Sequence, residues 1–451
     1  MAQSRLFGTD GIRGRFNEEP LTLELASAFG RAVASRFGHD NQPIVIGRDT
    51  RVSGPMLESA VASGIISMGV DVMLVGVIPT PAIAFLTRHL QGCAGIVISA
   101  SHNPFEDNGL KIFKGDGLKC DDALELELEG LILGDALLQQ AKNGTKAGTV
   151  QTWPDAAKRY AELAIKTYGQ GLDLSGLRIV VDAGNGAAYE TTPSVLRALG
   201  ADVTTFHIEP DGVNINANCG STYPEVIQQA VKESGAHIGL SHDGDADRLI
   251  CCDETGSLLD GDEMLAIIGL DWLRRGKLAQ KTVVATVMSN LGLDECFAKA
   301  GGKVLRAGVG DRYVLEQMLA HDLNLGGEQS GHIILREYNT TGDGLVTALE
   351  LLRIMKASGE PISRLRQGLR KYPQLLVNVK VRERIPLDQL PEVTETVKTV
   401  EGELGTKGRI LLRYSGTESK IRLLVETRDE ALLQPTADRV LAPIKKHLNV
   451  V

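Results

Sequence analysis

The chain holds 451 residues, too many for one ordinary hydrophobic core at about 150 residues per domain, so we expect three or four domains. Its net charge of −9 at pH 7 argues against a general nucleic-acid binder, because release of counterions from a nucleic acid needs a basic protein surface. Acidity does not exclude anionic substrates, since a local cluster of arginines binds phosphate on an acidic protein.

The cysteines and the apolar segments indicate the cellular compartment of the protein. The six cysteines contain no Cys-x-x-Cys pair, so neither a zinc site nor a disulfide framework is expected, and we interpret them as reduced thiols of a cytosolic protein. The apolar stretch 61–86 is interrupted by Asp71, Pro79 and Pro81, which argues against a membrane span. Residues 1–8 lack the apolar core of a signal peptide. The sequence therefore predicts a cytoplasmic protein with no membrane or nucleic-acid partner.

A strand–helix–strand pattern occurs three times along the chain. In the first copy, residues 43–47 form an apolar strand, residues 56–67 have helical spacing, and residues 68–76 end the helix and open the next strand. Related copies span residues 178–206 and 281–305. Such βαβ units predict successive α/β domains.

Each copy is followed by one further strand that ends in a polar loop. These segments are 96–101, 237–248 and 323–332. Three α/β domains would each present such a loop at the carboxyl edge of the sheet, where α/β proteins place their functional groups. We therefore expect the three loops to meet at one cleft.

The last part of the chain has a different pattern. A strand is expected at 375–382, a helix at 388–403, two strands within 408–426 and a helix at 430–448, which predicts a smaller α+β domain. One of the predicted linkers lies at 251–260. The four predicted domains are 1–150, 151–252, 253–366 and 367–451.

Three aspartates alternate in the second polar loop: Asp243, Asp245 and Asp247. In an extended segment all three carboxylates face one side, and they repel one another unless a hard cation such as Mg²⁺ lies among them. A calcium-binding EF-hand is the rival interpretation, because Glu254 falls at the twelfth position of that loop. Arg248, however, occupies the sixth position, where the EF-hand needs glycine, and the flanks have the pattern of strands. Aspartates of a plain surface turn remain an alternative.

The segment 413–422 gathers two arginines, hydroxyl groups and a glycine within one turn. Arginines bind phosphate oxygens bidentately and glycine exposes backbone N–H groups, so the segment is a candidate phosphate cradle. An ordinary hairpin turn explains the same residues equally well.

Two glycine-rich segments are further candidates. Glu328 and Ser330 lie between glycines in segment 326–332, an arrangement suited to gripping vicinal hydroxyls of a sugar, although a tight turn with a solvated Glu328 is the alternative. Arg13 lies among the glycines of segment 7–14, where the backbone approaches an anion closely, or is merely flexible near a terminus.

Ser101 follows the apolar run that begins at Gly95 and stands beside His102, shortly before Pro104. A hydroxyl at the carboxyl end of a strand is a candidate nucleophile or phosphoryl carrier. No Gly-x-Ser-x-Gly elbow surrounds it, which argues against a hydrolase triad. A helix-capping serine and a packed or capping His102 remain alternatives. Lys111 would most often be a solvated strand lysine.

In chain order, five motifs resemble those of the α-D-phosphohexomutases, most closely their bacterial glucosamine branch. The motifs are Phe7-Gly-Thr-Asp-Gly-Ile-Arg-Gly14, Ser99-Ala-Ser-His-Asn-Pro104 with Asp107-Asn-Gly-Leu-Lys111, Asp243-Gly-Asp-Ala-Asp-Arg248, Gly327-Glu-Gln-Ser-Gly-His332 and Arg413-Tyr-Ser-Gly-Thr-Glu418. The resemblance covers nearly the whole chain. It implies three similar α/β mixed-sheet domains and a smaller C-terminal α+β domain around a central cleft.

The resemblance implies that Ser101 is a phosphoserine. One Mg²⁺ per subunit would be bound by an oxygen of that phosphate together with Asp243, Asp245 and Asp247. Lys111 would be the general acid or base. The residues expected to support charge near the serine or to transfer protons are Arg13, His102, Arg248 and His332.

The resemblance also implies how the substrate is held. Glu328 and Ser330 would contact sugar hydroxyls. The phosphate that is not reacting would be bound by Arg413, Ser415, Gly416, Thr417 and Arg422. A homodimer is what the resemblance suggests for assembly.

The implied reaction is the interconversion of glucosamine 6-phosphate and glucosamine 1-phosphate through a 1,6-bisphosphate, for the synthesis of UDP-N-acetylglucosamine and peptidoglycan precursors. Segment 308–312 and Gly416 favour the glucosamine branch, whereas Ala246, Tyr414 and Ser419 depart from the family pattern. A mutase for phosphomannose or phosphoglucose is the alternative, since an amino group and a hydroxyl differ little in recognition. A non-catalytic phosphosugar-binding protein is disfavoured because the serine and all three aspartates are present.

Overall fold

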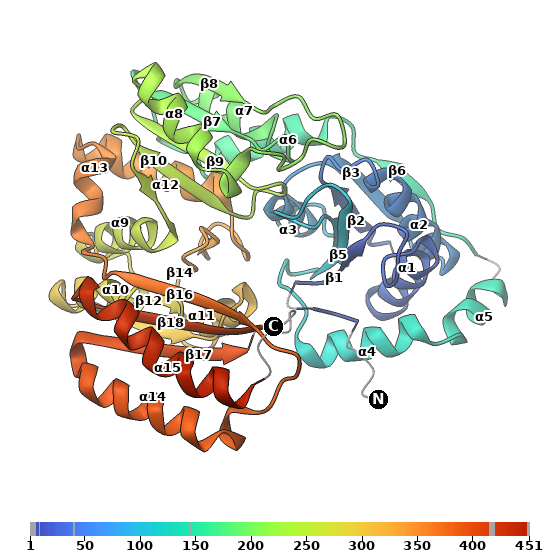
Figure 1. Cartoon of the computed structure of the whole chain (residues 1–451). Coiled ribbons are helices and arrows are strands. Elements are labelled where there is room, and N and C mark those ends of the chain that lie inside the picture. The colour runs from blue at the N-terminus through green and yellow to red at the C-terminus, as the bar shows by residue number, and fades with distance from the viewer. Residues whose placement is uncertain (1–5, 9, 39–40, 144–145, 415–419, 449–451) are drawn as a thin grey trace. The chain divides into compact units, whose positions relative to one another are not determined.

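The computed structural model describes residues 6–8, 10–38, 41–143, 146–414 and 420–448 (Figure 1). The chain divides into two compact units, one of residues 1–288 and 301–368 and the other of residues 289–300 and 369–451. Among the described residues, the larger unit carries three β-sheets and the smaller unit carries a fourth. The predicted α/β organisation, with a smaller α+β segment at the end, is confirmed.

The first sheet has the strand order β1-β5-β4-β2-β3-β6. Its central strands β2, β3 and β4 are parallel, and β5 is antiparallel to β4. Every residue of β4 is buried, which accounts for the unbroken apolar run before Ser101. The strands are β1 (Ile12–Arg15), β2 (Ile44–Arg48), β3 (Val72–Val77), β4 (Ala94–Ile98), β5 (Asp107–Lys114) and β6 (Val150–Thr152). The helices of this part are α1 (Leu23–Phe37), α2 (Gly54–Ser67), α3 (Thr80–His89), α4 (Asp122–Leu133) and α5 (Ala136–Asn143).

The second sheet has the order β11-β10-β9-β7-β8. Its strands are β7 (Arg178–Asp182), β8 (Asp202–Phe206), β9 (Ile238–His242), β10 (Leu249–Asp253) and β11 (Leu258–Leu259). The accompanying helices are α6 (Ala156–Thr167), α7 (Thr191–Ala198) and α8 (Glu225–Ser234). β7 is parallel to β8 and β9, whereas β9 and β10 are antiparallel.

The third sheet has the order β13-β12-β14-β15. Its strands are β12 (Thr282–Thr286), β13 (Lys303–Ala307), β14 (Leu325–Gly327) and β15 (Ile333–Leu335). The helices of this part are α9 (Gly261–Arg274), α11 (Asp311–Ala320), α12 (Gly344–Ser358) and α13 (Ile362–Leu365). β12 is parallel to β13 and β14, and β14 is antiparallel to β15.

The three sheets share one topology, since the orders β5-β4-β2-β3, β10-β9-β7-β8 and β15-β14-β12-β13 correspond strand by strand. In each sheet, a parallel strand is followed by an antiparallel strand, and the connection between the two carries a predicted motif. These connections are residues 99–106, 243–248 and 328–332. The expectation that the three polar loops follow equivalent strands is therefore correct.

The segment 251–260, which the sequence predicts to be a linker, is part of the second sheet. Cys251 pairs with Leu259 in the antiparallel contact of β10 with β11, and both cysteines of β10 are buried. A short polar turn joins two strands here, and composition alone does not distinguish such a turn from a linker. The last strand of the first sheet ends at Thr152, and the last strand of the second sheet ends at Leu259.

The smaller unit has a three-stranded sheet of order β16-β18-β17 and its own core. The strands are β16 (Gln374–Lys380), β17 (Gly408–Tyr414) and β18 (Lys420–Thr427), all antiparallel. The helices are α10 (Leu291–Lys299), α14 (Pro391–Leu404) and α15 (Leu433–His447). The predicted strand–helix–strand–strand–helix order is confirmed. Across both units, no described helix has the length and apolar character that crossing a membrane requires.

Candidate active site

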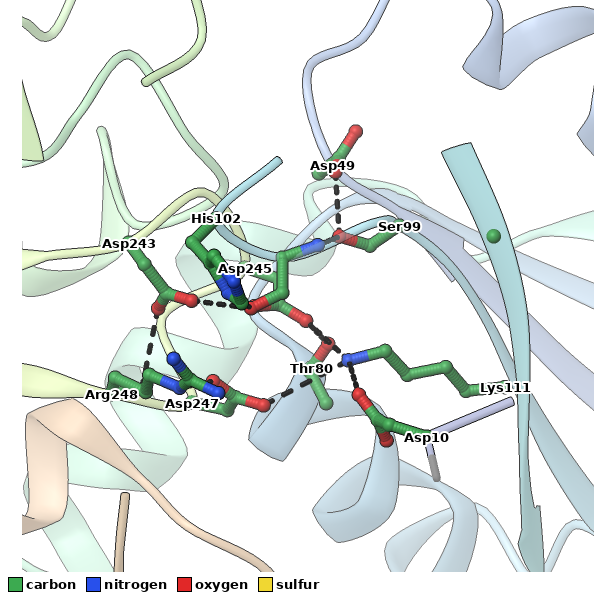
Figure 2. Close-up of polar contacts among 12 residues, drawn as sticks. Asp10, Asp49, Thr80, Ser99, His102, Lys111, Asp243, Asp245, Asp247 and Arg248 are labelled. Carbon is green, nitrogen blue, oxygen red and sulfur yellow. Dashed lines mark hydrogen bonds and ion pairs between the residues drawn. The ribbon is translucent and has the colours of Figure 1, made fainter. Parts of the chain in front are cut away.

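Ser101 lies in the loop after β4 and is 1% exposed. Its φ of +53° is in the left-handed region, which non-glycine residues seldom adopt. The hydroxyl Oγ donates a hydrogen bond to Asp243 Oδ2 at 2.5 Å and lies 3.3 Å from His102 Nδ1 (Figure 2). The next regular element is strand β5, so Ser101 does not cap a helix. The structure thus joins the first and second polar loops through this serine.

The three aspartates form one buried cluster at the end of β9. Asp243, Asp245 and Asp247 are 0%, 1% and 4% exposed, and their ligand oxygens all lie within 4.8 Å of one another. They stand between two antiparallel strands rather than two helices, which excludes the EF-hand interpretation, and their burial excludes the plain surface turn. Burial and the neighbouring charges of Asp247 and Asp245 raise the pKa of Asp243.

The cluster fits a cation. Asp245 Oδ1 and Asp247 Oδ1 are buried and accept no hydrogen bond from the described residues. Buried carboxylate oxygens without donors are costly, and several of them on one side of a loop are the ligands that a hard divalent ion prefers. The aspartate cluster is therefore able to hold a metal ion.

Lys111 reaches the same cluster from β5. Its Nζ lies 2.8 Å from Asp10 Oδ2, 2.8 Å from Asp245 Oδ2 and 3.8 Å from Asp247 Oδ2 (Figure 2). The side chain is 3% exposed, so the interpretation as a solvated strand lysine is wrong. Burial alone would lower the pKa of Lys111, but Asp10 and Asp245 outweigh it and raise the pKa. Lys111 is therefore an ammonium, able to donate a proton or a hydrogen bond.

Asp10 and Thr80 are contacts that the sequence analysis did not single out. Thr80, the first residue of α3, donates from Oγ1 to Asp245 Oδ2 at 2.7 Å and from its backbone N to Asp245 O at 2.9 Å. Asp10 binds both Lys111 and Lys119, the latter at 2.6 Å. Asp10 lies in the glycine-rich segment 7–14 together with Arg13, and a carboxylate among glycines is the sequence signal that marks it.

Two arginines and a histidine surround the serine and the aspartates. Arg13 pairs with Asp10 through Nη2, and Arg248 Nε lies 3.9 Å from Asp247 Oδ1. Burial, reinforced by the charges of Arg248 and Arg13, lowers the pKa of His102 to about 4. His102 is therefore a neutral imidazole near pH 7, while the two arginines supply positive charge.

The predicted sugar loop lies between β14 and β15. Glu328 Oε1 accepts a hydrogen bond from Gly310 N at 3.1 Å, and burial raises the pKa of Glu328. Ser330 is exposed. His332 is 2% exposed, its Nε2 accepts from Gly342 N at 3.2 Å, and its Nδ1 has no hydrogen-bond partner among the described residues.

The predicted phosphate cradle belongs to the smaller unit. Arg413 of β17 and Arg422 of β18 are directly opposite each other in the antiparallel register. Burial, followed by the charge of Arg422, lowers the pKa of Arg413. Two guanidinium groups on facing residues are suited to bind one phosphate, because each can donate bidentately to its oxygens. Ser415, Gly416 and Thr417 lie outside the described residues.

Comparison with known proteins decides the family. Models of phosphoglucomutase/phosphomannomutase α/β/α domains I, II and III match residues 4–137, 158–256 and 260–372, and the model of the C-terminal domain matches residues 376–442. The chain belongs to this family. The prediction of an α-D-phosphohexomutase, an enzyme of the isomerase class with a four-domain α/β fold, is thereby confirmed.

Curated relatives refine the comparison. The phosphoglucosamine mutase of Syntrophotalea carbinolica is 50% identical over 451 residues, which cover 99% of each chain. The phosphoglucosamine mutase of Desulforudis audaxviator is 52% identical over 438 residues, which cover 97% of each chain. These relatives favour the glucosamine branch over the phosphomannomutase or phosphoglucomutase alternative.

Solved structures agree on the fold. A phosphoglucomutase/phosphomannomutase family protein from Burkholderia thailandensis superposes with a TM-score of 0.83 at 26% identity, covering 100% of both chains. Aspergillus fumigatus N-acetylphosphoglucosamine mutase, solved with GlcNAc-6P and magnesium, has a TM-score of 0.68 at 17% identity, covering 98% of this chain and 95% of that one.

Proposed function

We propose that this chain interconverts glucosamine 6-phosphate and glucosamine 1-phosphate, and so supplies the amino sugar phosphate used to make UDP-N-acetylglucosamine. The observation that carries the proposal is the 2.5 Å contact of Ser101 Oγ with Asp243, inside a buried cluster that fits a cation. Whole-length relatives that are phosphoglucosamine mutases support the choice of sugar.

The proposed reaction has two transfers. The C1 hydroxyl of glucosamine 6-phosphate attacks the phosphorus of phospho-Ser101, the bond from phosphorus to Ser101 Oγ breaks, and a 1,6-bisphosphate forms. This intermediate turns over, and Ser101 Oγ then attacks the 6-phosphate, which leaves glucosamine 1-phosphate and restores the phosphoserine. Proton movements balance. In the first transfer the C1 hydroxyl loses a proton and Ser101 Oγ gains one, and in the return transfer Ser101 Oγ loses its proton and the departing C6 oxygen gains one.

The contacts of the charged residues support the roles that we propose for them. Lys111, held as an ammonium by Asp10 and Asp245, would protonate the departing Ser101 Oγ and recover that proton on the return transfer. His332, whose Nδ1 is buried without a partner among the described residues, is a second candidate for proton transfer. Arg13, His102 and Arg248 would stabilise the phosphoryl group by charge and hydrogen bonds.

A bound Mg²⁺ would neutralise charge on the transferring phosphoryl group. Asp243, Asp245 and Asp247 would hold the ion together with an oxygen of the Ser101 phosphate. The Oδ1 atoms of Asp245 and Asp247, which accept no hydrogen bond from any described residue, support this ligand set. Positioning and charge neutralisation are the main needs of phosphoryl transfer, so these residues supply what the reaction requires.

The remaining proposals concern binding and assembly. Glu328 and Ser330 would bind sugar hydroxyls, while the cradle would bind the second phosphate through Arg413, Ser415, Gly416, Thr417 and Arg422. Domain limits at 150, 252 and 366, a cytoplasmic location and a homodimer stay predictions. Light scattering of the purified chain checks the dimer.

The test of the function combines mass and kinetics. Intact mass with peptide mapping is expected to find one phosphate on Ser101, and Ser101→Ala is expected to stay folded while mutase turnover is lost. Unchanged turnover in Ser101→Ala would contradict the phosphoserine mechanism.

The sugar is tested by turnover of glucosamine 6-phosphate, glucose 6-phosphate and mannose 6-phosphate, each primed with its bisphosphate. We expect the highest kcat/KM for glucosamine 6-phosphate. A preference of about 100-fold for either neutral sugar would favour the alternative mutase instead.

A further inference from the structure

Arg51, which follows β2, is a fully buried arginine at 0% exposure. Its Nε donates to Asp49 Oδ2 at 2.8 Å. Its Nη1 and Nη2 donate to four backbone carbonyls, three in the loop that carries the serine and one at the first residue of β5: Pro104, Ser101 at 3.0 Å, Asn103 at 2.8 Å and Asp107 at 2.9 Å. All five N–H groups of the guanidinium are thus used, four of them between residues 101 and 107. The planar fork of the guanidinium therefore fixes the path of this loop.

A second path connects Arg51 with the other side of Ser101. Asp49 Oδ2, which accepts from Arg51, also accepts from Ser99 Oγ at 2.6 Å. Ser99 Oγ in turn accepts from Ser101 N at 2.9 Å (Figure 2). The backbone carbonyl of Ser101 is thus held by Arg51 directly, and its backbone N–H is held through Asp49 and Ser99. Both peptide groups that flank the Ser101 side chain are fixed.

The fixed conformation is one that serine rarely adopts. Ser101 has a φ of +53°, and residues in the left-handed region remain there only where their surroundings hold them. Asn216 adds a further restraint, because its Nδ2 donates to Ser101 O at 2.9 Å and to Asn103 O at 3.0 Å. In this conformation Ser101 Oγ lies 2.5 Å from Asp243 Oδ2.

The segment that carries Arg51 is itself anchored. Thr50 Oγ1 donates to Asn185 O at 2.6 Å, and Val52 N donates to Gly212 O at 2.9 Å. Both acceptors lie in the part of the chain that holds the second sheet, which also carries the aspartate cluster. The anchor of the serine loop is therefore tied to the structure that presents the aspartates.

We propose that Arg51 is a positioning residue for phosphoryl transfer, which holds Ser101 in the left-handed conformation that directs its Oγ at the aspartate cluster. The inference rests on the proposed function of Ser101 as the phosphoryl carrier. Arg51 does not react, and it acts through the backbone of the serine loop. A small displacement of a reacting oxygen is enough to slow transfer strongly, because in-line geometry is the main requirement of the step.

The experiment uses Arg51→Lys in the full-length chain with Mg²⁺. Lysine keeps the positive charge beside Asp49 but offers three N–H donors without the planar fork, so it cannot hold four carbonyls. We expect kcat to fall about 100-fold, the effect of a misplacement of about 1 Å, while KM for the sugar phosphate changes less than about threefold. Phosphorylation of the unphosphorylated enzyme by the 1,6-bisphosphate, followed by intact mass, is expected to slow to the same degree.

Arg366→Lys is the matched control. Arg366 also uses several N–H groups on buried partners, Asp253 at 2.8 Å and Glu263 Oε1 from Nε at 2.8 Å, but those partners belong to another part of the larger unit. Its kcat is expected to stay within about threefold of wild type even if its Tm falls, since lost stability alone does not move kcat of the folded enzyme. A kcat of Arg51→Lys that equals wild type, or that falls only as far as in Arg366→Lys, overturns the proposal.

Ser99→Ala keeps the proposal testable if Arg51→Lys does not fold. This variant removes the link that Ser99 makes between Asp49 and Ser101 N, and we expect kcat to fall about tenfold with KM unchanged, as the loss of one buried hydrogen bond predicts. Unchanged kcat in folded Ser99→Ala overturns the proposal. Wild type is assayed first with all three sugar phosphates. Turnover of another sugar but not of glucosamine 6-phosphate contradicts the proposed function alone, and the variants are then compared on the sugar that turns over.

Discussion

The Cβ atom that Gly331 lacks would lie 2.0 Å from the carbonyl oxygen of Leu249. The carbonyl of Gly331 accepts a hydrogen bond from Leu249 N at 3.1 Å, so the backbones of the two residues are in direct contact. Leu249 opens β10 directly after the aspartate loop, and Gly331 lies in the loop of Glu328. Glycine alone permits both this approach and the φ of +90° at residue 331.

We predict that Gly331→Ala separates these two loops. The free energy of unfolding is expected to fall by about 2 kcal/mol or more, because a backbone clash adds to the strain of a positive φ. KM for the sugar phosphate is expected to rise, since Glu328 moves with the loop. Denaturant unfolding and steady-state kinetics measure both quantities.

Gly359→Ala is the control for that prediction. Gly359 has a similar φ of +70°, but a Cβ atom at this residue would meet no atom of the described residues within 4 Å, so the substitution carries only the conformational cost of about 1 kcal/mol. An equal loss of stability in both variants, with KM unchanged in Gly331→Ala, would show that the close approach to Leu249 does not position the sugar loop.

Lys111→Met is expected to lower kcat by about 100-fold or more, the usual contribution of a positioned acid or base. The thioether keeps most of the length of the side chain but cannot donate a proton to Ser101 Oγ. Lys114→Met, at the end of the same strand, is the control, because Lys114 Nζ lies 3.4 Å from Asp116 Oδ2, outside the aspartate cluster. A comparable fall of kcat in both variants would contradict the assignment of Lys111 as the general acid or base.

Mg²⁺ binding is expected to depend on each aspartate of the cluster. Isothermal titration of Mg²⁺ into wild type and into Asp245→Asn or Asp247→Asn is expected to show at least about tenfold weaker binding in the variants, because one charged ligand is lost. Asp253→Asn, a buried aspartate of β10 outside the cluster, is the control and is expected to bind as wild type does. Removal of the ion by a chelator is expected to abolish turnover, and re-addition of Mg²⁺ to restore it.

The paired arginines are expected to bind phosphate. Arg413→Lys is predicted to raise KM for the sugar phosphate about tenfold, since lysine loses the bidentate contact, and to leave Mg²⁺ binding unchanged. Arg409→Lys on the same strand is the control, because Arg409 pairs with Glu426 at 2.7 Å. A normal KM in Arg413→Lys would contradict the phosphate cradle.

Asp343 gives a prediction of pH dependence. Burial raises the pKa of Asp343 to about 6, although hydrogen bonds from Val346 N and Asn339 Nδ2 offset part of this increase. The folded-state pKa lies above the unfolded value, which is near 4. The contribution of this carboxyl group to the free energy of unfolding is therefore fully present below pH 4 and is lost as the pH rises through 6.

The test compares the free energy of unfolding of wild type with that of Asp343→Asn at each pH. From pH 4 to pH 7, the free energy of unfolding of wild type is expected to fall, relative to that of Asp343→Asn, by roughly 2–3 kcal/mol, at about 1.4 kcal/mol per pKa unit. A constant offset between the two proteins does not affect the test. A difference that stays flat over this range would place the pKa of Asp343 at its ordinary value.

Local sequence patterns by themselves determined many of the strands and several residues of the candidate site. Buried parallel strands have continuous apolar runs, so the sequence predicted β4 and β9 and the polar loops after them. Alternation of aspartates two residues apart is visible in the chain itself, and so is the absence of a nucleophile elbow at Ser101. The order of the motifs then identified the family, which the relatives confirmed.

Tertiary structure alone decided which side chains support those motifs. Asp10 and Thr80, which the sequence did not single out, contact Lys111 and Asp245 respectively, although 235 residues separate Asp10 from Asp245 along the chain. Arg51 contacts a loop about fifty positions away through backbone carbonyls, an acceptor that every residue offers and no sequence pattern marks. Periodicity records which face of an element is buried, whereas these partners depend on how separate elements pack, and only the folded chain contains that information.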